Sequence, residues 1–525
     1  MVTTRDAYQA YYTKSAPLVE YMMNRLELRD GLSVLEPAAG DGVFVDAVLA
    51  REHQLNLELF ELNADAHAVL RQKYSESPGV QINLADTLLS PELHLAANFG
   101  GRYDRIIANP PYGGWQDYDK RKQLKSLYPN FYVKETYALF LARCIGLLRE
   151  GGRLVFIVPD TWLNLHLHSY LREYLLKFTK IKEISLFPSH FFPGVNFGYA
   201  NLSVLVLEKC GNLRECLENR LVVRKGFTRV EELSNGAAQQ FEFSQQEILD
   251  NLNHAFFIGE NRALATLINQ AALRIGDIAD CVTGFYSGND KKYLRPVIGA
   301  AKNAKNYQLV GSELISNNYL ASPDLLEGIA GPQCYLPIVK GGKAKYYKPD
   351  HWCMEWSKES VNHYKTDAKA RFQNPSYYFR FGLGVPMVTS GDITAALIES
   401  KLFDQSIVGV FPKDEAWVYY LLAFFNSPIC SRLIRAINPS ANNSANYIKK
   451  IPFIKPPANV FAEVTELTKS IVTQIKATGD YAQSDEAKLH AIFAELYQDK
   501  AIRPDAKTPA TVSRKTFHAT SITTN

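Results

Sequence analysis

The sequence has few cysteines, no long apolar run and little net charge. Its seven cysteines are scattered among 525 residues without a Cys-x-x-Cys pair, which argues against structural zinc and for a reducing cytoplasm. No apolar run reaches the length of a membrane span, and no signal peptide precedes the first polar residues. A net charge of +4 is weakly consistent with a nucleic-acid partner, because local patches matter more than the sum. We therefore expect a cytoplasmic globular protein without a membrane segment or a metal site.

The most informative segment is an apolar, strand-like run over residues 104–113 that contains Asn109-Pro110-Pro111-Tyr112. Proline has a fixed φ and no backbone N–H, so two in a row exclude a continuing helix or an inner strand. The backbone carbonyl groups before the prolines are therefore expected to lack a hydrogen-bond partner in a sheet. Next to them in the sequence are the amide side chain of Asn109 and the aromatic ring of Tyr112. These groups can accept two hydrogen bonds from a planar amine and stack on the ring that carries it. The alternative is a proline-rich turn with a packed tyrosine.

Upstream of this segment, the sequence predicts a strand, a turn of small residues and a helix. Residues 33–36 predict a short buried strand, followed by a turn over 37–42 and an apolar helical pattern over 43–49. This layout is typical of a nucleotide-type binding site. The turn has the spacing Glu-x-x-x-Gly-x-Gly rather than that of the dinucleotide fingerprint. Its acids Glu36 and Asp41 favour a ligand that carries positive charge, such as a sulfonium and an ammonium.

Two further predicted strands also end in an acid. Residues 57–61 end in Glu61, at a position where such folds usually hold a ribose diol. Residues 82–86 end in Asp86, whose carboxylate can accept a hydrogen bond from an adenine amine. Taken alone, each of these acids is best interpreted as a solvated residue at a strand end or as the N-cap of a helix. Three acids in successive strand-end positions, followed by the Asn-Pro-Pro-Tyr turn, favour a binding site.

With these motifs the chain resembles the S-adenosylmethionine-dependent N6-adenine DNA methyltransferases of restriction-modification systems. The order of its motifs is the gamma type, similar to the TaqI group, and residues 11–22 resemble the family's N-terminal cofactor segment. The resemblance implies an α/β fold, in which a Rossmann-like methyltransferase domain with a mixed seven-stranded sheet precedes an α+β target-recognition domain. It also implies S-adenosylmethionine as the cofactor and double-stranded DNA as the partner.

The resemblance also assigns roles to individual residues at the cofactor. Thr13 contacts the methionine carboxylate, Glu36 lies near the methionine moiety, Glu61 takes the ribose hydroxyls and Asp86 takes the adenine amine. Thr87 stands where the family often has an aromatic residue. The other residues expected at the cofactor are Pro37, Ala38, Gly40, Gly42 and Asn109.

The expected catalytic residues are Asn109, Pro110, Pro111, Tyr112 and Phe192. The Asn109 oxygen and the Pro110 carbonyl would bind both amine hydrogens of adenine and direct its lone pair at the methyl group, an orientation effect of roughly 7–11 kcal/mol in the best cases. Because the sulfonium already activates the methyl group, no metal is expected. A base inside a duplex must first be flipped out, and Tyr112 would then stack on it. Phe192 is expected on the other face, with Phe197 as the alternative and hairpin packing as the competing role for either.

The rest of the chain defines the expected domains. A helical pattern over 132–148 ends at a double glycine, and residues 153–159 predict an apolar central strand. The expected domains are a catalytic methyltransferase domain over 1–210, a connection over 211–255, a DNA target-recognition domain over 256–456, C-terminal helices over 457–500 and a disordered tail over 501–525.

Three segments of the region 256–456 interleave lysine or asparagine with glycine and tyrosine. Lysine suits phosphates as a point charge and asparagine suits adenine edges, so these segments predict contacts with DNA. Solvated loops are the alternative. The candidate DNA-binding residues are Lys291, Lys292, Lys340, Lys343, Lys345, Asn442, Asn443 and Lys449.

We therefore expect a monomeric, site-specific DNA methyltransferase that modifies adenine N6 and serves a restriction-modification system. No acid followed by a Glu-x-Lys pair marks a nuclease strand, and the chain begins at the methyltransferase motifs. A fused N-terminal endonuclease is thus not expected, and whether a separate cognate endonuclease partners the protein stays open. The alternatives are an RNA or protein-glutamine methyltransferase, which the lysine-rich second half disfavours, and a DNA-binding module with a vestigial site, which the intact motif disfavours.

Overall fold

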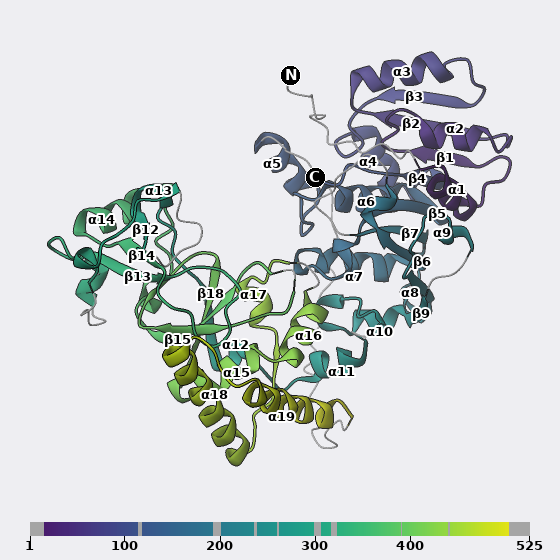
Figure 1. Ribbon diagram of the computed structural model, residues 1–525. Helices are drawn as coiled ribbons and strands as arrows, with labels where there is room; N and C mark the ends of the chain where they lie inside the picture. Colours follow the sequence, from purple (N-terminus) through teal and green to yellow (C-terminus); the bar gives the residue numbers. More distant parts are fainter. Residues whose placement is uncertain are drawn as a thin grey trace, which may run out of the picture. The chain divides into compact units, whose positions relative to one another are not determined.

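The computed structural model describes residues 15–113, 118–192, 201–235, 239–259, 262–298, 306–316, 323–389, 391–438 and 441–502. The chain divides into two compact units, one made of residues 1–265 and 435–441 and the other of residues 266–434 and 442–525 (Figure 1). The expectations for Thr13, Phe197 and the tail beyond residue 502 fall outside the described residues.

The first unit is built on one large sheet. Its strands are β1 (Ser33–Glu36), β2 (Asn56–Glu61), β3 (Val80–Leu84), β4 (Tyr103–Ala108), β5 (Leu148–Pro159), β6 (Thr179–Pro188), β7 (Asn201–Lys209), β8 (Arg220–Lys225) and β9 (Gln239–Ser244). They form a nine-stranded sheet in the order β3-β2-β1-β4-β5-β7-β6-β8-β9. Strands β1 to β5 pair in parallel, whereas β7 runs antiparallel to both of its neighbours, β5 and β6. The carboxyl ends of β1 to β6 therefore lie at one edge.

Helices surround this sheet, whose central strands are buried on both faces. The helices are α1 (Ala16–Leu26), α2 (Val43–Leu49), α3 (Ala64–Tyr74), α4 (Pro91–Asn98), α5 (Tyr118–Leu127), α6 (Thr136–Leu147), α7 (Ser169–Phe178), α8 (Leu213–Glu218), α9 (Glu232–Asn235) and α10 (Gln245–Leu249), with the 3-10 turns η1 (Asp160–Leu163), η2 (His166–His168), η3 (Ser189–Phe191) and η4 (Leu252–His254). The boundary between the two units, after Ala265, falls within α11 (Arg262–Gln270). Residues 154–159 of β5 are all buried, as expected for a strand covered on both faces. In the described part of the chain, no helix is both long and apolar enough to cross a membrane.

The sheet is larger than the seven strands expected from the sequence, because the segment 211–255 contributes β8 and β9. Strand β8 pairs in parallel with β6, with Ile184 opposite Val223, and β9 pairs antiparallel with β8. Leu221 and Val223 of β8 and Phe243 of β9 are buried, while their immediate neighbours within the two strands are more exposed. The segment is rich in charged residues and glutamine, and this composition led to the prediction of a domain connection over 211–255 instead of two strands. The first unit consequently extends to Ala265.

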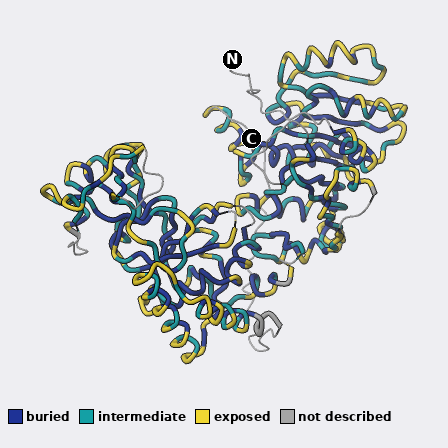
Figure 2. The backbone as a smooth tube through the Cα atoms, in the orientation of Figure 1, coloured by how far each residue is buried: buried dark blue, intermediate teal, exposed yellow. Residues whose placement is uncertain are grey.

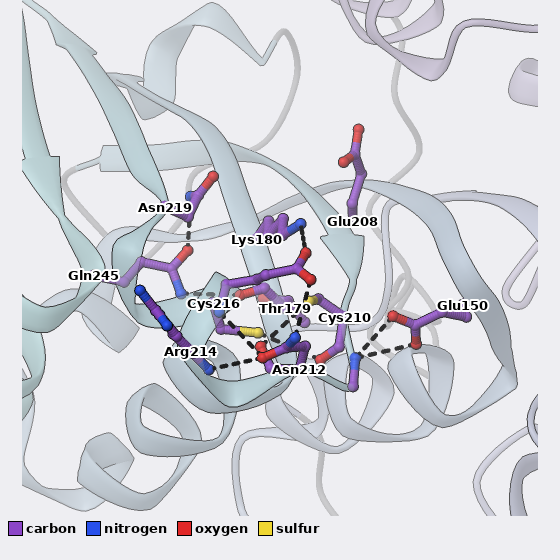
Figure 3. A network of polar contacts seen from close by, with 12 residues as sticks. Glu150, Thr179, Lys180, Glu208, Cys210, Asn212, Arg214, Cys216, Asn219 and Gln245 are labelled. Carbon is purple, nitrogen blue, oxygen red and sulfur yellow. Dashed lines mark hydrogen bonds and ion pairs between the residues drawn. The ribbon is translucent and has the colours of Figure 1, made fainter.

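The buried side chain of Gln245 fastens this extension to the rest of the sheet (Figure 3). Its oxygen accepts hydrogen bonds from the Ile181 backbone N–H (2.7 Å) and from Asn219 Nδ2 (2.9 Å). Its nitrogen donates to the carbonyls of Leu176 (2.7 Å) and Thr179 (2.9 Å). The amide therefore makes four hydrogen bonds, the number that its two acceptor sites and two donors allow.

The second unit combines small sheets with helices. Its strands are β10 (Leu273–Arg274), β11 (Ala279–Thr283), β12 (Leu294–Pro296), β13 (Tyr335–Val339), β14 (Trp352–Glu355), β15 (Phe381–Pro386), β16 (Ala396–Glu399), β17 (Leu402–Phe403), β18 (Ile407–Pro412) and β19 (Pro452–Phe453). They form sheets in the orders β11-β18-β15-β16, β12-β14-β13-β17 and β10-β19. The helices are α12 (Ile275–Ile278), α13 (Asp290–Tyr293), α14 (Lys358–Thr366), α15 (Val418–Phe425), α16 (Pro428–Ile437), α17 (Ala445–Ile448), α18 (Ala458–Thr478) and α19 (Gln483–Ile502), with the 3-10 turns η7 (Ser312–Leu314), η8 (Pro323–Glu327), η9 (Pro375–Tyr377) and η10 (Glu415–Trp417).

Aromatic side chains fill much of the second unit's interior. Phe285 lies edge-on to Trp356 and Tyr364, with ring centroids 5.5 and 4.9 Å apart. On the helical side, Phe424 of α15 stacks on Tyr497 of α19, with a centroid distance of 5.4 Å. Figure 2 shows where the buried residues lie in each unit: they follow the strands, whereas exposed residues follow the outer helices and loops. The second unit thus has the α+β character expected from the sequence.

We predict that Gln245→Leu destabilises the first unit by about 2–5 kcal/mol, because it removes the Gln245 partner of two buried carbonyls, of the Ile181 N–H and of Asn219 Nδ2, which keeps only its bond to the Ile181 carbonyl. The neighbouring Gln246 is exposed, and Gln246→Leu is the matched control, with an expected change within about 0.5 kcal/mol. Urea unfolding of both variants measures the difference. Equal midpoints for the two variants would show that the Gln245 network contributes little.

Candidate active site

The acids predicted from the sequence lie along the carboxyl edge of the large sheet. Strands β2, β1 and β4 are neighbours, so Glu61, Glu36 and Asn109 leave the sheet side by side. Asp86 follows the end of β3, the next strand outward from β2. Ligands of open α/β sheets bind at this edge. The fold therefore brings together four positions that are far apart in the sequence.

Glu61 ties the glycine turn after β1 to the end of β2. Its Oε2 accepts a hydrogen bond from the Gly40 N–H (2.8 Å) and its Oε1 accepts one from the Asn63 N–H (2.7 Å). Gly42 has φ +87°, and a Cβ there would lie 2.5 Å from the Tyr74 hydroxyl. Glycine is favoured at this position because it adopts a positive φ without strain and has no Cβ to collide with Tyr74. The turn is thereby held in one conformation before a ligand binds.

Glu36 supplies the strongest electrostatic feature of the site. Its side chain is 2% exposed, and its Oε2 is a buried oxygen without a hydrogen-bond partner. Burial, together with the nearby carboxylates of Asp41, Glu61 and Asp46, raises the pKa of Glu36 well above its usual value. A buried carboxyl with a spare oxygen, surrounded by further acids, suits a cationic ligand. The residues present therefore fit the sulfonium and ammonium of S-adenosylmethionine.

Asp86 and Thr87 connect the third strand end to its surroundings. Asp86 Oδ1 accepts from the Leu88 N–H (2.9 Å), and its Oδ2 forms an ion pair with Lys120 of α5 (2.7 Å). The buried Thr87 hydroxyl donates to the Pro37 carbonyl (2.6 Å), so it links the third strand end to the first turn. Thr87 thus makes a polar contact where the family often places an aromatic ring. An adenine amine at Asp86 would share the carboxylate with Lys120.

The Asn-Pro-Pro-Tyr turn begins directly after β4. Asn109 is partly buried, while the ring of Tyr112 is fully buried. Phe192 follows η3 beyond the end of β6 and is 1% exposed. Strands β5 and β7 separate β4 from β6, so the two strands that lead to these rings end at the same edge, three strand spacings or roughly 14 Å apart. A base that stacks on either ring must displace atoms that now cover it.

Asp160 was not identified from the sequence, although it obeys the same rule as the predicted acids. It follows the last residue of β5, between the ends of β4 and β6. Asn201 Nδ2 donates to Asp160 Oδ2 (3.1 Å), and burial raises the pKa of Asp160 to about 6. An acid directly after an apolar central strand was the signal that could have found it.

Two of the predicted DNA-binding lysines form ion pairs inside the second unit. Lys340 lies 2.9 Å from Asp290 and 3.4 Å from Asp404. Burial opposes the charged form, but the two aspartates outweigh it and raise the pKa of Lys340. Lys345 pairs with Glu486 of α19 at 2.8 Å. Both lysines therefore have partners within the fold.

The other candidate DNA-binding residues differ in exposure. Asn443 is fully buried, and its backbone N–H donates to the Met387 carbonyl (2.6 Å). Asn442, beside it, is exposed and forms an isolated bridge with Val388. The exposed lysines in this set are Lys291, Lys292, Lys343 and Lys449.

The comparisons with known proteins agree with this geometry. Residues 50–192 match the sequence model of a family described as Eco57I restriction-modification methylase. The chain is 26% identical over 297 residues to the Type II methyltransferase M.AccI of Acinetobacter calcoaceticus, which covers 52% of this chain and 53% of that protein. It is 34% identical over 170 residues to a Type II methyltransferase of Thermus thermophilus, which covers 30% of this chain and 37% of the relative. The chain thus spans about half, or less, of these curated relatives.

A solved structure extends the likeness to most of the chain. A nuclease-deletion mutant of the Type ISP restriction-modification enzyme LlaGI, in complex with a DNA substrate mimic, has a TM-score of 0.54 at 11% identity, covering 88% of this chain and 47% of that one. This likeness confirms the α/β fold alone, while the family match and the curated relatives confirm the resemblance to restriction-modification methyltransferases. The family match also supports S-adenosylmethionine as the cofactor.

We predict that S-adenosylmethionine binds more tightly as the pH rises, and that Glu36→Gln removes this dependence. The raised pKa favours the protonated form of Glu36 in the free protein, whereas a bound cation would favour the ionised form, so binding should be coupled to proton release. The affinity should rise by up to about tenfold per pH unit until Glu36 ionises in the free protein. Calorimetric titrations in buffers of different ionisation enthalpy measure the proton release. Glu76→Gln, at an exposed position of the same unit, should keep the wild-type slope, and a flat wild-type profile would contradict the prediction.

Proposed function

We propose that this protein is a site-specific DNA methyltransferase that transfers a methyl group from S-adenosylmethionine to N6 of a flipped-out adenine. The observation that carries the proposal is the meeting of Glu36, Glu61, Asp86 and the Asn109 turn at one edge of the sheet. The acids suit a cationic donor, and the turn suits a planar amine. The names of the curated relatives, which are Type II methyltransferases, support the same reaction class.

The turn after β4 provides the groups that the amine needs. An exocyclic adenine amine is a poor nucleophile because its lone pair is delocalised into the ring. The Asn109 side-chain oxygen and the Pro110 carbonyl accept its two hydrogens and favour a pyramidal nitrogen, while Tyr112 stacks on the base. S-adenosylmethionine, held by Glu36, Glu61 and Asp86, supplies an activated methyl group. Orientation by these residues is the main source of catalysis in this proposal.

The second unit supports double-stranded DNA as the partner. Its exposed candidates Lys343, Lys449 and Asn442 offer positive charge for phosphates and an amide for base edges. Lys340 and Lys345 have carboxylate partners, so we assign them a structural role within the unit. We further propose a monomer in the cytoplasm that works beside a separate endonuclease, in line with cysteines that are free and buried. The alternative, an RNA or protein-glutamine methyltransferase, does not by itself explain why these exposed lysines should contact duplex DNA.

A labelled-cofactor assay tests the proposed function. The protein is incubated with methyl-labelled S-adenosylmethionine and, in parallel reactions, duplex DNA, RNA or a protein extract, and the products are digested. We expect label in N6-methyladenine from duplex DNA. Label only in RNA or in glutamine would replace the proposal with that alternative, and no transfer to any substrate would support the vestigial site.

Asn109→Ala should lower methyl transfer to DNA by at least about 100-fold and leave the dissociation constant of S-adenosylmethionine within about threefold, because the residue orients the amine. Single-turnover rates and equilibrium binding separate the two effects. Normal turnover by Asn109→Ala would remove the central residue from the mechanism.

Tyr112→Ala should reduce the transfer rate more than Tyr112→Phe, since stacking needs the ring rather than the hydroxyl and is worth about 1–3 kcal/mol. Rates with the same duplex and saturating cofactor provide the comparison. Equal losses in the two variants would argue against stacking and for a role of the hydroxyl.

Lys343→Ala and Lys449→Ala should each weaken DNA binding and lower the slope of log affinity against log salt by about 1, if each contacts one phosphate. Lys469→Ala, an exposed lysine paired with Glu466 on α18, is the control and should leave the slope unchanged. Anisotropy titrations of a labelled duplex at several salt concentrations measure the slopes. Unchanged slopes in all three variants would place the DNA elsewhere.

A further inference from the structure

Thr136, at the start of α6, is bonded to the Asn-Pro-Pro-Tyr turn. Its hydroxyl donates to the Pro111 carbonyl at 2.5 Å, and the side chain is 8% exposed. The Pro111 carbonyl belongs to the planar peptide that leads into Tyr112. A hydrogen bond to this oxygen therefore restrains the orientation of the peptide from which the Tyr112 side chain projects.

The next residue, Tyr137, ties the same end of α6 to the segment beyond β5. Its hydroxyl lies 3.0 Å from Thr161 Oγ1 and 3.0 Å from His168 Nε2. Tyr137 and His168 are both buried, and burial lowers the pKa of His168 to about 3. The imidazole is therefore neutral, and its Nε2 can accept the Tyr137 hydrogen. Two consecutive residues thus connect the turn after β4 with the turns after β5.

Helix α6 is a rigid support for these contacts. All of its residues except Ala142 and Gly146 are buried, so its packing fixes the position of its first turn. The turn after β4 needs such a support, because Pro110 and Pro111 have no N–H with which to bond to the neighbouring backbone. The Thr136 hydroxyl supplies a donor from outside the turn.

Thr136 does not act here as an ordinary helix cap. The N-cap position of α6 is Glu135, which makes no side-chain capping hydrogen bond. A capping hydroxyl accepts hydrogen bonds from the first N–H groups of its helix. The hydroxyl of Thr136 instead donates away from the helix to the turn after β4. The contact therefore serves the turn rather than the helix terminus.

We propose that Thr136 is a positioning residue for methyl transfer, which holds the Pro111–Tyr112 peptide so that the Tyr112 ring meets the target base correctly. The inference rests on the proposed function and adds a residue that contacts neither substrate nor cofactor. A displacement of about 1 Å in such a site can cost 100-fold in rate, so one hydrogen bond can have a large kinetic effect. A purely structural role would instead change stability without a specific loss in the transfer step.

Thr136→Val and Thr136→Ser provide a matched test, because valine keeps the shape without the donor and serine keeps the donor. We expect Thr136→Val to lower the single-turnover rate by about 10- to 100-fold, with the dissociation constant of S-adenosylmethionine within about twofold of wild type. Thr136→Ser should recover the rate to within about threefold of wild type. All rates are measured well below the melting temperature of each variant, so that partial unfolding does not contribute.

A double-mutant cycle identifies the residue through which Thr136 acts. If it acts through Tyr112, adding Thr136→Val to Tyr112→Ala should cost at most about threefold more, because the two effects are coupled. Equal rates for Thr136→Val and wild type, equal losses for the valine and serine variants, or full additivity with Tyr112→Ala would each overturn the inference. The wild-type assay separates the two proposals: N6-methyladenine formation with a silent Thr136→Val refutes the positioning role alone, whereas a wild type that modifies no adenine refutes both.

Discussion

The buried carboxyl of Glu36 is the constraint on which the site depends. Taking a carboxyl group out of water without a full set of partners is unfavourable, and other acids nearby make its ionisation more costly still. The fold keeps it in place because the strand that carries it is buried in the centre of the sheet. A cation bound at this edge of the sheet would favour ionisation of Glu36 and would be attracted to the resulting carboxylate. A pyrophosphate would instead make ionisation of the nearby acids more costly, so the site suits the cationic methyl donor that we propose.

The other contacts of the site lie at the same carboxyl edge of the large sheet. Glu61 holds the glycine turn through two backbone N–H groups, and Thr87 bonds the third strand end to Pro37. These contacts restrict the turns at the edge where we propose that the cofactor binds. On the proposed substrate side, the turn after β4 lacks two N–H groups and accepts a hydrogen bond from Thr136. The two sides are therefore stabilised in different ways, by acid-to-backbone bonds on one and by a packed helix on the other.

Much of this could be predicted from the sequence, because it depends on local pattern. The strands at 33–36 and 57–61 and the helix over 132–148 follow from apolar patterns. Strands β1 and β2 match them to within one residue, whereas α6 begins only at Thr136. The resemblance to restriction-modification methyltransferases could be found from the sequence because each motif that carries it is a short run of adjacent residues, such as Asn109 to Tyr112. Features that depend on contacts between distant residues could not be predicted. The ion pair of Lys345 with Glu486 and the bonding of Gln245 to Leu176 and Thr179 join segments whose proximity only the fold creates.

The most direct test of the central claim is a crystal structure of the protein with S-adenosylmethionine bound. The account predicts the cationic methionine moiety within about 4–6 Å of the Glu36 carboxyl. It also predicts the ribose hydroxyls on Glu61 and the methyl group directed toward Asn109. A cofactor bound at another edge of the sheet, or bound at this edge with its methyl group directed away from Asn109, would contradict the account.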